Sequence, residues 1–341
     1  MANNLALLAA RHEHFPHVRE EGWRHTDRPV GFSAQQSHYS IKRGAMIAGM
    51  GMNQIISVPS ERYAGSMIPE ALEEAIYKEK AKGNNPFFVN STMGSTVIGG
   101  FDDSHAISDI CKRHGLWHHM DACWGGLFAF SNKTNYLFDG AEKADSVALC
   151  VHKGLSVPQQ CSYLITNNKL NALEASNHSG ATYLFHKTDY SQYDLGDKTL
   201  SCARHADALK MWMMFKRHGK DGLSNIADWA MDMSKHLHML LEAQPDKFEM
   251  VNKPMANNIC FSYSPKRFRN GDVPYTYEDK CEVHKEIFSR MQKEGTVLVQ
   301  HQPLEEFALP NFFRVVIRNS QLRKEDLEYI LSEIDRLGQD L

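Results

Sequence analysis

The chain has 341 residues, of which 42% are hydrophobic and 23% are charged, an ordinary balance for a globular protein. Its net charge of -3 at pH 7 gives no reason to expect nucleic acid or another polyanion as a partner. No apolar run approaches the roughly 20 residues of a membrane-spanning helix, so no membrane span is expected. The length allows one large domain and a smaller one.

The seven cysteines are scattered and form no CxxC pair, which is typical of proteins from a reducing cytosol. The first residues, Met1 to Asn4, lack the charged and then apolar form of a signal peptide. We therefore expect a cytoplasmic protein. Although there are 18 histidines, no clustered ligand set with usable spacing occurs, so no metal site is expected.

Helical and strand patterns alternate through the first half of the sequence. In chain order they predict a helix at Leu5–Arg11, a strand at Val30–Ser33, a helix at Ile41–Ala48, a strand at Gln54–Val58, a helix at Pro69–Ala81, a strand at Pro86–Asn90, a helix at Asp103–His114, and strands at Leu116–Met120, Val147–Cys150 and Cys161–Ile165. Alternation of this kind indicates an α/β sheet. The continuously apolar strand Pro86–Asn90 is typical of a parallel sheet that is buried on both faces.

The pattern changes in the second half. Residues 182–197 have little periodicity and predict a long loop, a kind of segment that is often functional. Two long helices, Leu200–Phe215 and Leu223–Ala243, follow it and end where Pro245 breaks the pattern. The remaining patterns are strands at Phe248–Val251, Asn258–Tyr263, Val297–Gln300 and Phe312–Ile317 and helices at Lys280–Lys293 and Lys324–Leu337. We expect a large domain at residues 1–243 and a small α+β domain at residues 244–341.

Asp121 ends one predicted strand, and Lys153 follows another. Ligands of open α/β sheets bind beyond the carboxyl ends of the strands, where His38 and Ser95 are also expected. A lysine amine can form a Schiff base with pyridoxal phosphate (PLP), and a carboxylate can keep the pyridine nitrogen of PLP protonated. Each residue taken singly is more often a solvated strand end, but their combination predicts a PLP site.

The sequence resembles the group II PLP-dependent decarboxylases, in the branch of glutamate, cysteine sulfinate and aspartate decarboxylases. The resemblance runs from about Leu5 to Leu341. It is carried by the ordered blocks Ser37–Ser40, Asp121–Gly126, His152–Lys153, Gln160–Ser162, Tyr183–Phe185, Tyr193–Lys198, Asn311–Arg314 and Arg336–Leu341. It implies the fold type I of aspartate aminotransferase, with a large mixed, mainly parallel sheet, PLP as the cofactor, and a homodimer.

The resemblance also implies roles for the residues of the PLP site. Lys153 would form the Schiff base, and Asp121 would pair with the pyridinium nitrogen. His38 would stack on the ring and orient the departing carboxylate, although a lone histidine in a loop is more often structural. Ser95, in a turn where the family usually has threonine, would bond near the ring oxygen of the cofactor.

Three more residues beside that site come from the resemblance. His152 would contact the phosphate or the partner subunit. Cys123 would lie against the ring where the family commonly has alanine (DAAWGG), and Cys150 stands where the family has the asparagine of NPHK. A shifted cofactor environment is therefore expected.

For the substrate, the resemblance implies that Arg314 grips the α-carboxylate, which a guanidinium can bind in bidentate fashion. Tyr190 would protonate the carbon that loses carbon dioxide, with Tyr193 as a competing candidate. Gln159, in the sequence Gln-Gln-Cys-Ser, favours the aspartate and cysteine sulfinate enzymes and would bind the substrate. The expected products are hypotaurine or β-alanine, and glutamate decarboxylation to γ-aminobutyrate (GABA) is the alternative.

Relatives carry a further region before the helix at Leu5, including a Gly/Ser loop that binds the phosphate. Met1 to Asn3 replace the end of that loop here, so weaker PLP binding and dimer contacts are expected. An inactive paralogue that binds a full-length relative is therefore a second hypothesis. An aminotransferase is a third, and His38 and the segment Tyr183–Lys198 argue against it because both resemble decarboxylase features.

Overall fold

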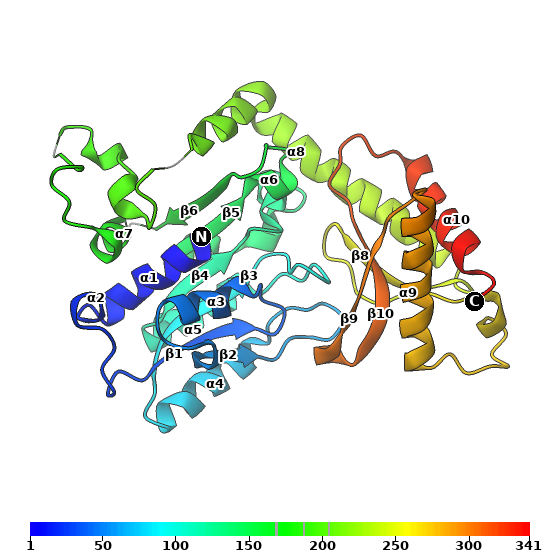
Figure 1. Ribbon diagram of the computed structural model, residues 1–341, viewed down its shortest axis with the longest axis horizontal. Coiled ribbons are helices and arrows are strands. Elements are labelled where there is room, and N and C mark those ends of the chain that lie inside the picture. Colours follow the sequence, from blue (N-terminus) through cyan, green and yellow to red (C-terminus); the bar gives the residue numbers. More distant parts are fainter. Residues whose placement is uncertain (168–169, 187, 204) are drawn as a thin grey trace. The chain divides into compact units, whose positions relative to one another are not determined.

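The computed structural model describes residues 1–167, 170–186, 188–203 and 205–341 (Figure 1). The chain forms two compact units. The large unit comprises residues 1–60, 66–96 and 101–223, and the small unit comprises residues 61–65, 97–100 and 224–341. None of the helices within these described ranges is long and apolar enough to cross a membrane.

The large unit is built on a six-stranded sheet in the order β2-β1-β3-β4-β5-β6. Its strands are β1 (Pro29–Ala34), β2 (Ile55–Val58), β3 (Asn85–Thr92), β4 (Trp117–Asp121), β5 (Ser146–Cys150) and β6 (Ser162–Thr166). All neighbours pair in parallel except β6, which is antiparallel to β5. This is the α/β sheet that the alternating sequence pattern predicted, and it is mixed and mainly parallel, as the resemblance implied.

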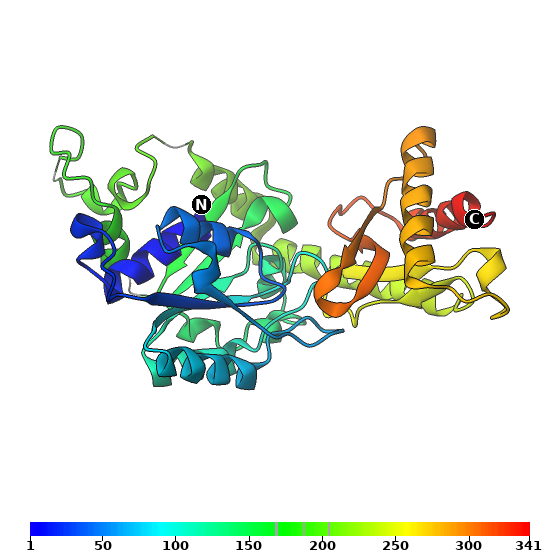
Figure 2. The ribbon, with the colours of Figure 1, turned by 60° about the horizontal axis from the view of Figure 1, so that its bottom comes forward.

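Helices cover both faces of this sheet, as Figure 2 shows with blue α1 and α3 on one side and cyan α4 on the other. On the first face lie α1 (Ala2–His14), α3 (Ser40–Ile47) and α7 (Leu170–Asn177), and on the second lie α4 (Pro69–Ala81) and α5 (Ser104–His114). Because α1 packs against α3, α7 and several strands at once, its apolar run from Leu5 to Ala10 is buried on all sides. Phe87 and Phe88 of β3 are fully buried in the same core.

Local sequence signals set the ends of the helices on the second face. Pro69 stands in the first turn of α4, where its missing N–H costs no helical hydrogen bond. Asp103 caps α5, because its carboxylate accepts a hydrogen bond from the Ala106 N–H at 2.9 Å. Gly115 ends α5 in the left-handed conformation, with φ of 68°.

Shorter elements complete the large unit. These are the helices α2 (Val18–Glu21) and α6 (Val151–Gly154) and the 3-10 turns Met52–Gln54, Gly126–Phe130, Asn135–Phe138, Ala141–Lys143, Ser191–Tyr193 and Gly196–Lys198. The last two turns lie in the segment that was predicted to be a loop. Asp197 anchors this segment by accepting hydrogen bonds from the Ser179 N–H at 2.9 Å and from the His178 ring.

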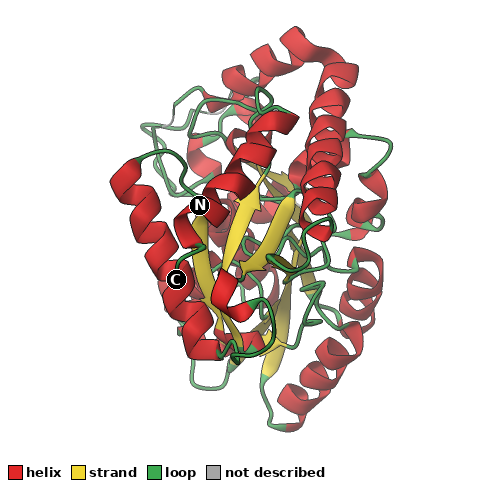
Figure 3. Cartoon of the chain, turned by 90° about the vertical axis from the view of Figure 1, so that its right-hand side faces the viewer, coloured by secondary structure: helices red, strands yellow, loops and turns green. Residues whose placement is uncertain are grey.

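The small unit is a four-stranded antiparallel sheet in the order β7-β8-β10-β9, with helices packed on it (Figure 3). Its elements are β7 (Phe248–Met250), β8 (Asn258–Tyr263), β9 (Gln300–Leu304), β10 (Leu309–Val316), α9 (Tyr277–Glu294), α10 (Lys324–Gly338) and the 3-10 turns Lys266–Phe268 and Glu305–Phe307. One apolar core joins Phe261 and Phe313 of the sheet to Ile287 of α9 and Ile334 of α10. This is the α+β unit that was expected at the end of the chain.

Two details differ from the sequence-based expectation. Helix α8 (Asp207–Glu242) leaves helical geometry at Gly219, and its later residues Leu237 and Leu241 pack in the core of the small unit. The division between the units therefore follows Leu223 rather than residue 243, because the helix breaker at Pro245 marks the end of α8 and not a boundary. Strand β9 begins at Gln300, where the expected strand ended, and it tolerates Pro303 because it lies at the sheet edge.

Candidate active site

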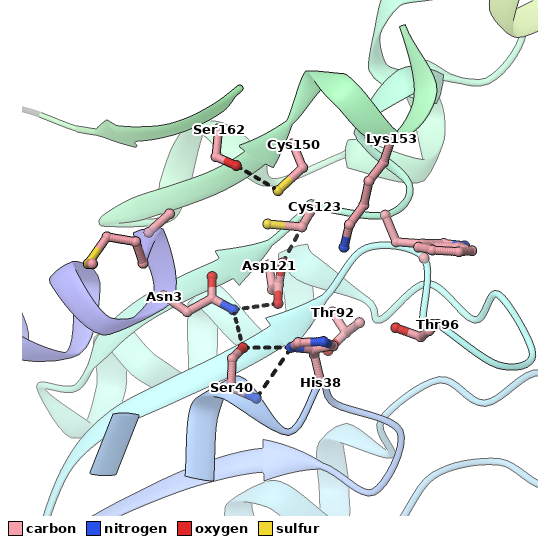
Figure 4. Close-up of a pocket in the computed structure, with 14 residues that line it drawn as sticks. Asn3, His38, Ser40, Thr92, Thr96, Asp121, Cys123, Cys150, Lys153 and Ser162 are labelled. Atoms are coloured by element: carbon pink, nitrogen blue, oxygen red, sulfur yellow. Dashed lines mark hydrogen bonds between the residues drawn. The ribbon is translucent and has the colours of Figure 1, made fainter. Parts of the chain in front are cut away.

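A pocket of the large unit opens at the carboxyl ends of β3, β4 and β5 (Figure 4). Its volume is about 140 Å³. Four residues predicted from the sequence line it together, namely His38, Asp121, Cys123 and Lys153. The parallel register explains their meeting, since neighbouring strands in such a sheet bring their carboxyl ends to the same edge.

Lys153 reaches the pocket because α6 begins directly after β5, at Val151. Its side chain points into the pocket, and its amine lies 5.5 Å from the centre of the Trp124 ring (Figure 4). An aromatic face at this distance attracts the cationic form of an amine. The lysine therefore presents its nitrogen beside an aromatic wall.

The backbone is closely packed beside this wall. Gly94 has a φ of 82°, and a Cβ atom there would lie 2.8 Å from the backbone of Gly125. A Cβ atom on Gly125 would in turn meet the Met93 carbonyl oxygen at 2.5 Å. Only glycine allows the loops after β3 and β4 to approach this closely, so the two glycines determine the shape of this side of the pocket.

Asp121 is the last residue of β4 and is only 4% exposed. Its Oδ1 accepts a hydrogen bond from the Cys123 N–H at 3.0 Å, and its Oδ2 accepts one from the Asn3 amide at 2.7 Å. Because an ionised carboxylate has about four acceptor positions, Asp121 keeps capacity to bind a cationic N–H in the pocket.

Asn3 contacts several side chains in and beside the pocket, which the sequence did not indicate. It is buried near the start of α1, and its amide also donates to the Ser40 hydroxyl at 2.9 Å. Its carbonyl oxygen lies 3.3 Å from Nε2 of His119. Nothing in the sequence around Asn3 pointed to these contacts, because its partner Asp121 is 118 positions away.

The direction of these hydrogen bonds can be followed from the core. The Trp117 indole donates to the Ser146 hydroxyl at 2.9 Å, so Ser146 donates its own proton to Nδ1 of His119, also at 2.9 Å. Burial lowers the pKa of His119 to about 4, so this ring is neutral at pH 7 and has one N–H. That proton is on Nε2, which donates to Asn3.

The same chain of hydrogen bonds determines which nitrogen of His38 carries the proton. Because Ser40 accepts from Asn3, its hydroxyl proton is available for Nδ1 of His38, 2.8 Å away, and the Ser40 N–H also points at this atom at 3.3 Å. Burial lowers the pKa of His38, the nearby Lys153 charge lowers it further, and Asp121 opposes the change. His38 is thus neutral, and its Nε2–H is available to a ligand.

Two cysteines of the pocket face each other. Cys123 follows β4 and Cys150 ends β5, and the Cys150 sulfur also lies 3.1 Å from the Ser162 hydroxyl (Figure 4). A hydrogen bond from Cys123 lowers the pKa of Cys150 to about 6, whereas the same contact and burial raise the pKa of Cys123. The local environment therefore shifts the pKa values of two identical side chains in opposite directions.

Other predicted residues do not line this pocket. Ser95 is buried between Gly94 and Thr96, which do line it. Nδ1 of His152 lies 2.7 Å from the backbone oxygen of Cys161 and 3.1 Å from its nitrogen, so this ring is engaged by the backbone. Gln159 is exposed. The roles given to these three side chains stay predictions.

The residues expected to act on the substrate belong to other segments of the chain. Tyr190 and Tyr193 are 76% and 73% exposed, in the segment between α7 and α8. Arg314 belongs to β10 of the small unit, where it pairs with Cys260 of β8, and burial lowers its pKa. Among the described residues, no three His, Cys, Asp or Glu side chains group as metal ligands.

Known proteins are similar to this chain over its whole length. Residues 1–264 match the pyridoxal-dependent decarboxylase conserved domain. The human cysteine sulfinic acid decarboxylase is 38% identical over 344 residues, covering all of this chain and 69% of that protein. The glutamate decarboxylase of Drosophila melanogaster is 39% identical over 351 residues, covering all of this chain and 67% of that protein.

A solved structure gives the same result for the fold. The crystal structure of mouse CSAD superposes with a TM-score of 0.94 at 36% identity, covering all of this chain and 70% of that one. The chain therefore belongs to the pyridoxal-dependent decarboxylase family. The family resemblance, the fold type I architecture and PLP as the family's cofactor, all predicted from the sequence, are confirmed.

Proposed function

We propose that this chain decarboxylates a small acidic amino acid with PLP as cofactor, and that cysteine sulfinate or aspartate is the preferred substrate. One observation carries the proposal. The amine of Lys153, the carboxylate of Asp121 and the ring of His38 line a single pocket of the large unit. A PLP-dependent decarboxylation can use all three of these groups.

The pocket fits PLP in its donors and acceptors. When bound, PLP supplies an electron-withdrawing pyridinium ring that accepts the electron pair left by the departing carboxylate. Lys153 would hold the cofactor covalently through its amine. Asp121 would bind the protonated ring nitrogen with the acceptor positions that Asn3 and Cys123 leave available.

His38 would act on the substrate through Nε2. Since Nδ1 is occupied by Ser40, the neutral ring has its proton on the opposite nitrogen, where it can donate to a carboxylate oxygen. A donor in this position would hold the carboxylate in the orientation from which it leaves.

The remaining roles concern the substrate and the proton. Arg314 would bind the α-carboxylate, and Gln159 would contact the acidic side chain. Tyr190 would return a proton to the carbon that has lost carbon dioxide, with Tyr193 as the alternative donor. His152 and Ser95 would contact the cofactor. These assignments are supported by the family to which the chain belongs.

The substrate class is supported by the relatives. Human cysteine sulfinic acid decarboxylase and the Drosophila glutamate decarboxylase both align with the whole of this chain. We favour cysteine sulfinate or aspartate, which would yield hypotaurine or β-alanine. Decarboxylation of glutamate to GABA is the second candidate, because the identity to the glutamate enzyme is 39% against 38% for the human cysteine sulfinate enzyme.

We also propose a cytoplasmic homodimer. Its support is a set of large apolar side chains on the first part of α8, of which Trp212 is 56% exposed and Met213 is 58% exposed. Surface aromatic and apolar residues of this size are typical of subunit interfaces. The cytoplasmic location is supported by the cysteines, because all seven are free thiols, as is usual in a reducing compartment. Sedimentation of the purified chain would measure the assembly.

The test begins with the purified chain, to which PLP is added before reduction with borohydride. Peptide mass spectrometry should find the cofactor on Lys153, and Lys153→Ala should abolish the label. Lys112→Ala, which replaces an exposed lysine of α5, is the control and should keep it. Release of carbon dioxide is then measured with cysteine sulfinate, aspartate and glutamate.

The outcomes separate the hypotheses. Turnover of cysteine sulfinate or aspartate in preference to glutamate supports the proposal. Turnover of glutamate alone overturns the substrate preference. A chain that is folded but takes no label at Lys153 contradicts the proposed activity and favours a non-catalytic partner of a full-length relative.

A further inference from the structure

The two cysteines of the pocket lie on neighbouring parallel strands at matching positions. Asp121 of β4 pairs with Ala148 of β5. Cys123 comes two residues after Asp121, and Cys150 comes two residues after Ala148. Neighbouring strands are about 4.8 Å apart, and a disulfide spans Cα atoms about 4.4–6.8 Å apart. The Cys123 thiol already donates a hydrogen bond to the Cys150 sulfur, and Figure 4 shows the two sulfurs facing one another.

The surroundings of Cys150 make it the nucleophile of the pair. Cys123 and the Ser162 hydroxyl both bond to its sulfur, and the Lys153 and His152 side chains add positive charge nearby. These contacts lower its pKa, so Cys150 is a better nucleophile at pH 7 than an ordinary thiol. Its position in the pocket lining makes the sulfur accessible to a small oxidant.

Cys123 has the complementary property. Its thiol is the donor in the contact with Cys150, and burial together with the Asp121 charge raises its pKa further. By comparison, Cys111 and Cys260 are both buried, and burial raises the pKa of both. Cys123 therefore stays protonated until Cys150 has reacted, which is what a resolving thiol requires.

We propose that Cys123 and Cys150 form a redox-responsive pair, which a hydroperoxide converts to a disulfide inside the cofactor pocket and a thiol reductant restores. In the first step the Cys150 thiolate attacks one peroxide oxygen, the O–O bond breaks, and Cys150 becomes a sulfenic acid while hydroxide leaves. In the second step the Cys123 sulfur displaces the sulfenic oxygen, which takes up the Cys123 thiol proton and leaves as water. Overall the two cysteines lose two electrons, and hydrogen peroxide is reduced to one water and one hydroxide, which becomes a second water on taking up a proton.

The disulfide would change the pocket in two ways. It removes the negative thiolate beside the Lys153 amine and breaks the contact with Ser162. It also moves Cys123, whose N–H donates to Oδ1 of Asp121. Because Asp121 is the proposed partner of the cofactor ring, the oxidised chain should bind PLP less tightly, by about tenfold for the loss of one charge-assisted hydrogen bond.

The first experiment needs no cofactor. The reduced full-length chain is treated with hydrogen peroxide, the remaining thiols are alkylated, and the peptides are analysed by mass spectrometry before and after dithiothreitol. We expect a Cys123–Cys150 cross-link that dithiothreitol reverses. Cys150→Ser and Cys123→Ser should each abolish it. Cys202→Ser, the matched control at an exposed cysteine, should leave it unchanged.

Wild-type protein gives a second measurement that is independent of the variants. The rate at which iodoacetamide alkylates Cys150 should reach half of its maximum at a pH of about 6, in line with the pKa of this thiol. Faster oxidation of Cys202 than of the pair, or oxidation of Cys150 beyond sulfenic acid without a cross-link, would overturn the proposal. So would a Cys150 alkylation rate that rises only above pH 8.

The effect on the cofactor rests on the proposed function, whereas formation of the disulfide does not. PLP is therefore titrated into reduced, oxidised and re-reduced protein, with the disulfide content measured by mass in each sample. Weaker binding that dithiothreitol restores supports the coupling. Equal affinity in the reduced and the fully cross-linked protein refutes it, and a reduced protein that binds no PLP contradicts the proposed function instead.

Discussion

Replacing Asn3 with alanine should disturb the pocket more than any change of its neighbour Asn4. Asn3 donates to the carboxylate of Asp121 at 2.7 Å and to the Ser40 hydroxyl at 2.9 Å, and it accepts from His119 at 3.3 Å. Alanine keeps the helix but removes all three contacts. The adjacent Asn4→Ala is a matched control, because the Asn4 side-chain oxygen is buried without a hydrogen-bond partner among the described residues.

The magnitude follows from the kinds of bond that are lost. A hydrogen bond to a charged group contributes about 1.5–3 kcal/mol and a neutral one about 0.5–1.5 kcal/mol. Water from the pocket can replace part of this, since Asp121 and Ser40 both line it. We therefore expect a loss of about 2 kcal/mol in the free energy of unfolding, or about 30-fold in PLP affinity where that loss falls on the bound state.

Two assays measure this effect. Urea unfolding of the cofactor-free protein gives the change in stability, and titration with PLP followed by absorbance gives the change in affinity. If Asn3→Ala alters both quantities by no more than Asn4→Ala does, then Asn3 does not support Asp121. The chain of hydrogen bonds from Trp117 to His38 would then have no energetic importance.

Three further predictions concern titration and proton delivery. Asp335 accepts hydrogen bonds from a tyrosine, an arginine and a lysine, which hold its pKa at about 2 against the cost of burial. Its contribution to stability should therefore be complete above about pH 4 and be lost as the pH falls through about 2. Asp335→Asn should lower the free energy of unfolding by about 2 kcal/mol at pH 7, as measured by hydrogen exchange of α9 and α10. Burial raises the pKa of Asp102 to about 7, so the large unit should lose stability as the pH rises from about 4 to 7. Asp102→Asn should reduce this dependence of the unfolding free energy on pH, as measured by urea titrations at several pH values. Tyr190→Phe should lower kcat by about a hundredfold with little change in KM, whereas Tyr193→Phe should not, and the reverse result would transfer the proposed role to Tyr193.

Much of the secondary structure could be predicted because burial leaves a periodic pattern in the sequence. The helix at Pro69–Ala81 and the strand at Asn258–Tyr263 were found with the bounds that their patterns predicted. Where the pattern was ambiguous, as at Val297–Gln300, the position of the strand depended on which residues could pair with β10. Pairing is a property of the assembled sheet and not of the segment alone.

Part of the site could be predicted from the sequence in the same way. Asp121 and Lys153 each follow a strand of a predicted parallel sheet, and residues in that position meet at one edge. The sequence by itself therefore determined the fold class, the family and the pair of groups that the cofactor needs. These features depend on local patterns and on the general geometry of parallel sheets, which any chain with those patterns shares.

Only the tertiary structure decided the contacts between distant segments. Asn3 meets Asp121 because α1 packs across the sheet, and no pattern near either residue encodes that position. Cys123 faces Cys150 because the register of β4 and β5 brings two separate turns together, and a shift of one residue would separate the sulfurs. The physical reason is that propensity and periodicity act within a few residues, whereas the packing of whole elements determines which distant side chains touch.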